Sequence, residues 1–167
     1  MLIDTVIRVG DLTLNEMRDI DPVFVPHSHL GHIAALPSRL NDVGIRRGKP
    51  ISLYALLSTR EALKPHILND LIRPDFLKTP SVEASDLRLF PIEVGQQKPV
   101  AGMLVEALPA QHSVSALGYF VSTKELRRFL PEIQENAPID VRESSSSRSK
   151  SWSLRRCSAT KTRVLLC

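Results

Sequence analysis

Apolar residues recur with two spacings along the first 123 residues, and the spacing distinguishes predicted strands from predicted helices. Short apolar runs predict strands at residues 1–6, 23–25, 51–56, 87–92, 103–108 and 116–121. Spacings of three and four residues predict helices, and the clearest one carries Ile33, Leu36, Leu40 and Val43 on one face. Pro37 is expected to kink this helix or to bound its first turn. Strands that first alternate with helices and then follow one another indicate an α/β domain with mixed sheets.

Polar residues mark the expected ends of several elements. Thr13 with Glu16, and Ser58 with Glu61, have the spacing of a capping box, so each pair predicts the start of a helix. The second of these helices is expected to run towards Leu71. A Gly- and Gln-rich hairpin is expected to link the fourth predicted strand to the fifth.

The composition is that of an ordinary globular domain except near the C-terminus. The 167 residues are 43% hydrophobic and 24% charged, which is ordinary for a globular domain with a core of its own. Residues 142–163 carry seven basic side chains against Glu143 alone, so the body that precedes them is nearly neutral. A basic nucleic-acid-binding face is therefore not expected on the fold. Cys157 and Cys167 lie in or beyond this segment and lack metal-ligand spacing.

The chain carries no pattern of membrane insertion or secretion. No apolar run approaches the roughly 20 residues that a membrane span requires, and no signal segment follows Met1. The expectation is a cytoplasmic protein with no membrane partner. The Ser-rich stretch that begins at Arg142 predicts disorder. Its one aromatic residue, Trp152, is too little for base stacking, so a nucleic-acid partner is not expected either.

Candidate chemistry is concentrated directly after the strand predicted at residues 23–25. His27, His29 and His32 fall within six residues and precede the clearest predicted helix. Zinc favours imidazole nitrogen, and a zinc site that keeps a position open for water supports hydrolysis. His27 and His29 can reach one ion from an extended or turning backbone, whereas His32 would point to a neighbouring position. A polar loop produces the same pattern, so both interpretations stay open at this point.

The wider sequence resembles the metallo-β-lactamase superfamily, whose signature is His-x-His-x-Asp-His. Residues 25–37 carry that resemblance. Further stretches are similar to the class II 3',5'-cyclic-nucleotide phosphodiesterases, namely residues 10–17, 47–51, 61–69, 73–76 and 109–119. Because the similarity covers residues 1–123, the resemblance implies a partial metallo-β-lactamase αβ/βα sandwich. Residues 124–167 would then form a non-family tail, largely disordered.

The resemblance also implies a metal site and a reaction. His27, His29 and His112 would hold a first zinc ion, and His32 would help to hold a second. The family opens the cyclic phosphodiester of cAMP or cGMP to a 5'-monophosphate, so a small-molecule cyclic nucleotide is the implied substrate. Metal ions assist such a reaction because they lower the pKa of water and neutralise charge on phosphoryl oxygens.

Three departures from the family pattern reduce this expectation. Gly31 stands where the signature has the aspartate ligand of the second metal, so one zinc ion at most is expected. Residues 1–4 are similar to the second strand of the family's first hairpin, so the chain is expected to be truncated by one strand. The family's Gly-Asp-Thr-Gly turn and distal histidine have no in-frame counterpart after Thr123.

Hydrolysis is accordingly expected to be impaired or absent in this chain. Two alternatives stay open beside the phosphodiesterase. One is a non-catalytic metal-binding remnant, and the other is a metallo-β-lactamase-fold hydrolase of other phosphoesters or of thioesters. Outside the histidine cluster, structural roles are expected for His66 on a helix, for Tyr119 in the core, and for Asp11 and Asp21 at turns or caps.

The genetic code offers an explanation for the missing motifs. Codons assembled from the last base of one codon and the first two of the next permit Gly-Asp-Thr-Gly across residues 131–135. The same shift permits an apolar run such as Val-Ile-Ile-Glu-Val across residues 143–152. One shift recovers both family features in the right order. We infer that the chain after about Thr123 is translated out of frame.

The nucleotide sequence tests this inference directly. An independent determination of the gene from codon 115 onward is expected to show a single inserted or deleted base that restores Gly-Asp-Thr-Gly. Codons that are incompatible with both frames would end the idea.

Overall fold

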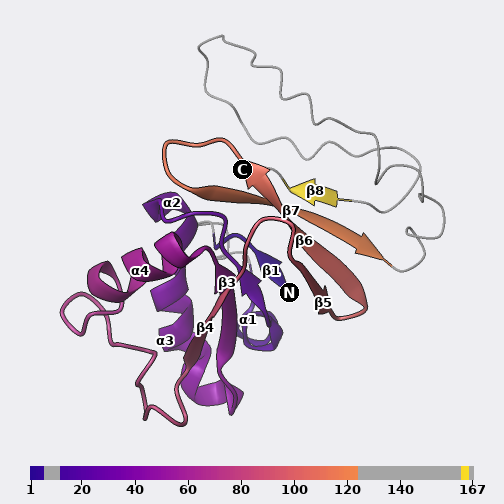
Figure 1. The fold of residues 1–167 in the computed structure, drawn as a ribbon. Coiled ribbons are helices and arrows are strands. Elements are labelled where there is room, and N and C mark those ends of the chain that lie inside the picture. The colour runs from indigo at the N-terminus through magenta and orange to yellow at the C-terminus, as the bar shows by residue number, and fades with distance from the viewer. Residues whose placement is uncertain (6–11, 124–162, 166–167) are drawn as a thin grey trace, which may run out of the picture.

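Two four-stranded sheets form the framework of the computed structural model, which describes residues 1–5, 12–123 and 163–165. The elements follow one another as β1 (Leu2–Ile3), α1 (Leu14–Asp19), β2 (Val23–Phe24), α2 (Leu30–Ile33), α3 (Ala35–Arg47), β3 (Ile51–Ala55), α4 (Leu57–His66), β4 (Leu87–Pro91), β5 (Gln97–Val100), β6 (Met103–Ala110), β7 (Ala116–Thr123) and β8 (Arg163–Leu165). The helices lie beside one sheet, and the second sheet lies across its other face (Figure 1). This α/β arrangement is the fold class that the sequence predicts.

The first sheet is parallel throughout, in the order β1-β2-β3-β4. Strand β2 is apolar because both of its faces are covered, and Val23 and Phe24 are fully buried. At the edge, β4 is covered on one face only, since Arg88 and Phe90 are exposed. Leu36, Leu40 and Val43 of α3 pack against Val23 and Leu53 of the sheet to form the first hydrophobic core. None of the helices among the described residues is long and apolar enough to cross a bilayer.

The second sheet is antiparallel, in the order β5-β6-β7-β8. Alternate residues of β6 and β7 point towards the first sheet, as the two-residue period of a strand dictates. Val105, Ala107, Leu117 and Tyr119 thereby meet Phe24 in a second core between the sheets. The two cores place β2 at the centre of the sandwich, with one core on each side of it.

Two hydrogen bonds join the sheets at the end of β2. The Tyr119 hydroxyl donates to the carbonyl of Val25 at 3.0 Å. The backbone N–H of Leu117 donates to the carbonyl of Pro26, also at 3.0 Å. Tyr119 is fully buried, so its predicted core role is confirmed. These bonds fix the backbone immediately before His27.

The expected helix start is right for α1 and wrong for α4. Thr13 and Glu16 form both bonds of a capping box at α1. Helix α4 instead begins after Leu56, without a side-chain cap, so Ser58 lies inside the helix and the second predicted capping box is wrong. Leu56, the residue before the helix, packs against the second core, so tertiary packing overrides the local polar signal here.

Helix α4 also ends earlier than predicted. Its last residue is His66, and the chain does not remain helical to Leu71. The side-chain oxygen of Asn69 accepts hydrogen bonds from the backbone N–H groups of Leu71 and Ile72. Such a side-chain turn gives the backbone an alternative to the helix, which is why asparagine favours helix ends and turns.

The predicted hairpin between the fourth and fifth strands is also corrected. β4 pairs with β3 in the parallel sheet, and the partner of β6 is the additional strand β5. Pro99 weakens the strand signal of β5, because proline lacks a backbone N–H for a sheet ladder. The tight connection is therefore between β5 and β6, and the chain crosses from one sheet to the other after β4.

Two further predictions concern chain boundaries. Helical residues are interrupted at Ala34 between α2 and α3, three residues before Pro37, in agreement with the predicted first-turn boundary. Within the expected tail, residues 163–165 form β8 beside β7. Residues 124–162, where the frame-shifted motifs and most of the disorder are predicted, lie outside the described residues, as does Asp11.

The hydrogen bond between Tyr119 and Val25 is testable against a matched control. Tyr119→Phe removes the donor from a buried carbonyl and is expected to lower the free energy of unfolding by about 1–3 kcal/mol. Tyr54→Phe keeps the ring stack with Phe24 and is expected to change it by less than about 0.5 kcal/mol. Urea denaturation measures both, and equal losses would show that the Tyr119 hydroxyl does not join the sheets.

Candidate metal centre

The candidate metal ligands gather near the end of β2, where the chain turns into α2. In a parallel sheet the carboxyl ends of all strands share one edge, which is a common position for ligand sites. His27 and His29 lie in the turn after β2, and His32 lies in α2. His112 comes from the second sheet, in the loop that joins β6 to β7.

The fold brings three of these four histidines into one cluster. His27, His29 and His112 each offer a ring nitrogen, and these nitrogens lie within 4.8 Å of one another. The ring centroids of His27 and His112 are 4.2 Å apart, and those of His29 and His112 are 4.7 Å apart. Three imidazoles at this separation can offer their nitrogens to a single small cation.

His27 is the buried member of the cluster. It is 1% exposed, and neither of its ring nitrogens has a hydrogen-bond partner among the described residues. Burial, and then the neighbouring His32, His112 and His29, lower the pKa of His27 to about 4. Its imidazole is therefore neutral near neutral pH and keeps a lone pair. Unpaired buried polar atoms are costly, and a bound cation would remove that cost.

His32 is held by a carboxylate that the sequence analysis did not single out. Its Nδ1 lies 2.7 Å from Oδ2 of Asp4, and the Thr5 hydroxyl donates to its backbone carbonyl. Burial raises the pKa of Asp4, although the hydrogen bond with His32 opposes that rise. Asp4 falls inside the strand predicted at residues 1–6, but β1 ends at Ile3, and this places the carboxylate at the edge where the strand ends meet.

Asp4 stands in an unusual backbone conformation. Its φ is +72°, in the left-handed region that aspartate adopts more readily than most residues. Strained residues of this kind cluster at functional sites. When the Nδ1–H of His32 donates a hydrogen bond to Asp4, the Nε2 atom of the neutral ring is free to accept a hydrogen bond or to hold a cation.

Gly31 supplies no ligand atom to this centre. A Cβ placed on Gly31 would meet no atom within 4 Å, so the position has room for a larger residue. His32 lies outside the three-histidine group, although its ring is 4.2 Å from that of His27. Its predicted part in holding a second ion stays a prediction.

The remaining candidates have structural surroundings. His66 is exposed at the end of α4. Asp21 accepts a hydrogen bond from the backbone N–H of Ser52 and lies 3.7 Å from the Arg47 guanidinium, which agrees with a turn role.

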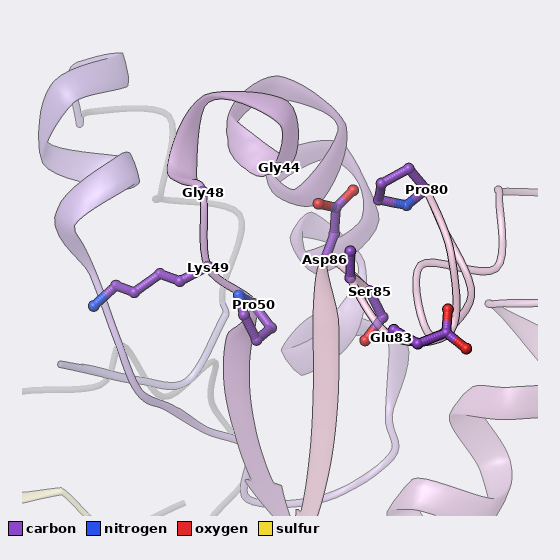
Figure 2. A pocket seen from close by; sticks show the side chains of 9 residues that line it. Gly44, Gly48, Lys49, Pro50, Pro80, Glu83, Ser85 and Asp86 are labelled. Carbon is purple, nitrogen blue, oxygen red and sulfur yellow. The ribbon is translucent and has the colours of Figure 1, made fainter.

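A cavity of about 580 Å³ lies at the opposite edge of the parallel sheet, between the end of α3 and the starts of β3 and β4 (Figure 2). The Asp86 carboxylate packs against Gly44 there, where an added Cβ would lie 2.8 Å from its oxygen. None of the clustered histidines lines this cavity, so it is separate from the candidate metal centre.

Comparison with known proteins supports the fold. No protein-family profile and no curated protein matches the chain. Unliganded yeast PDE1 is 19% identical, with a TM-score of 0.56 over 65% of this chain and 32% of that chain. The metallo-β-lactamase fold protein YhfI from Bacillus subtilis is 14% identical, with a TM-score of 0.54 over 72% of this chain and 45% of that one.

A diphosphatase from the PhnP family is 21% identical, with a TM-score of 0.54 over 72% of this chain and 44% of that one. The chain thus spans less than half the length of each of these three proteins. The likeness establishes a partial metallo-β-lactamase fold, as the sequence predicts.

Two histidine variants test whether zinc binds at the cluster of His27, His29 and His112. His27→Ala is expected to weaken zinc binding by at least about 10-fold, since it removes the buried donor with two unpaired nitrogens. His66→Ala, on the exposed end of α4, is expected to leave the affinity unchanged. Calorimetric zinc titrations measure both, and equal affinities would place the zinc elsewhere.

Proposed function

We propose that this chain forms the cation-binding part of a phosphodiesterase site that takes 3',5'-cyclic nucleotides. The convergence of His27, His29 and His112 from both sheets carries the proposal. The sequence resemblance to class II cyclic-nucleotide phosphodiesterases supports the substrate class. The fold shared with yeast PDE1 and with a diphosphatase supports phosphoester chemistry in general.

The donor set favours zinc. Three imidazoles and no thiolate or carboxylate make up the cluster in the described residues. Imidazole nitrogen suits zinc, and a three-ligand site keeps a position for water or substrate. A bound zinc ion lowers the pKa of water and polarises a phosphoryl oxygen. The unpaired nitrogens of His27 fit such an ion, because burial keeps that ring neutral.

The protein's own residues supply orientation. The bonds from Tyr119 and Leu117 fix the backbone that leads into His27. Asp4 is hydrogen-bonded to Nδ1 of His32, and this leaves the lone pair on Nε2 of His32 available beside the cluster. His29 and His112 are exposed, so a substrate can approach the cluster from their side.

Gly31 favours the alternative of a metal-binding remnant with little turnover. Phosphodiester cleavage at a two-metal site relies on ions that clamp both the attacking and the leaving oxygen. Because position 31 carries no carboxylate, a second ion would lack one oxygen ligand and the negative charge of that ligand. We therefore expect slow or no hydrolysis by this polypeptide.

Substrate binding and turnover test the two parts of the proposal. In the presence of zinc, cAMP is expected to bind to the chain, and a thioester of similar size is not. His27→Ala is expected to abolish cAMP binding, because the phosphate is held through the cation. Ligand-observed NMR detects the binding, and preference for the thioester would contradict the substrate class.

The turnover rate for hydrolysis of cAMP to 5'-AMP is expected to stay far below the roughly 1–10³ s⁻¹ of typical enzymes. Gly31→Asp has room for its side chain but is not expected to restore turnover by itself. Chromatographic detection of 5'-AMP measures both proteins. Turnover within the enzymatic range by the unmodified chain would refute the impaired site.

A further inference from the structure

The Nδ1 atom of His112 lies against two polar groups of the residue that follows it, Ser113. The backbone N–H of Ser113 donates to Nδ1 of His112 at 2.8 Å. The Ser113 hydroxyl lies 3.1 Å from the same nitrogen. A nitrogen that accepts a backbone N–H carries no proton, so the neutral ring bears its proton on Nε2.

This arrangement does not suit cation binding through Nε2. A neutral imidazole has a single lone pair, and in His112 the Ser113 N–H already uses it. His32 shows the opposite arrangement, since Asp4 accepts its Nδ1 proton and frees Nε2. Metal-bound histidines usually donate their second ring N–H to an acceptor, which fixes the tautomer.

We propose that Ser113 is the positioning residue that switches His112 between two tautomers. Without a cation the backbone N–H of Ser113 holds the Nε2–H form. When Nε2 of His112 binds a divalent cation, its proton passes through solvent to Nδ1, and the Ser113 hydroxyl accepts that Nδ1–H. The ring carries one proton before and after the change, so no proton is gained or lost overall.

The chemistry of serine fits both states. A hydroxyl can donate or accept, and it already lies at hydrogen-bond distance from Nδ1. His112 and Ser113 are both exposed in the loop, so the released backbone N–H can turn to water at little cost. The inference rests on the proposed cation site and adds how its third ligand becomes available.

Imidazole NMR reads the tautomer directly. Long-range ¹H–¹⁵N correlation spectra of the full chain at mildly alkaline pH are expected to show His112 as Nε2–H without zinc. With zinc the spectra are expected to show Nδ1–H. An Nε2–H ring in the zinc-loaded protein, or an Nδ1–H ring in both states, would overturn the switch.

Variants of Ser113 test the hydroxyl. Ser113→Ala is expected to weaken zinc binding by about 10-fold, the usual loss for such an acceptor, and Ser113→Thr is expected to restore it. Ser115→Ala, exposed in the same loop, serves as the matched control and is expected to change nothing.

The outcomes also separate this inference from the proposed function. If the unmodified chain binds no zinc, the cation site itself fails. If it binds zinc and Ser113→Ala binds it equally well, the site stands and the role of Ser113 is refuted.

Discussion

Two hydrogen bonds across the sandwich, from Tyr119 and Leu117 to the carbonyls of Val25 and Pro26, hold the candidate site together. They attach β7 to the segment that leaves β2, so the turn bearing His27 cannot move independently of the second sheet. The loop before β7 carries His112, and the same attachment brings that ring against His27. A site shared by two sheets thus depends on a contact made a few residues away from it.

Imidazole rings dominate the candidate metal centre. Four imidazoles lie close together at one edge of the sheet, and the Asp4 carboxylate beside them is hydrogen-bonded to His32. His27 remains neutral because it is buried among the other rings. Burial thus stabilises the neutral form of His27, which is the protonation state that metal binding requires. Gly31 offers no ligand atom, so the donor set in the described residues consists of imidazoles alone.

The sequence predicts much of the first half of the fold because local signals and packing agree there. Thr13 and Glu16 cap α1 as expected, and the apolar spacing of α3 faces the core. Prediction fails where a local signal competes with tertiary packing, as at Ser58, or where a strand carries proline, as in β5. Strand β4 pairs with β3 in the parallel sheet and not with the strand that follows it, and no local sequence pattern distinguishes these two partners.

The same distinction applies to the site. The spacing of His27, His29 and His32 predicts a metal site, and the family resemblance adds His112 from far along the chain. The structure groups His112 with His27 and His29 and leaves His32 beside them. The Asp4 carboxylate and the two contacts of Ser113 depend on backbone geometry at loop and strand ends, which periodicity does not report.

The most direct test of the histidine centre is zinc K-edge X-ray absorption of the zinc-loaded chain. A zinc ion held by His27, His29 and His112 is expected to have a first shell containing about three imidazole nitrogens at roughly 2.0–2.1 Å. A shell containing sulfur at roughly 2.3 Å would assign the metal to Cys157 and Cys167 and contradict the histidine centre.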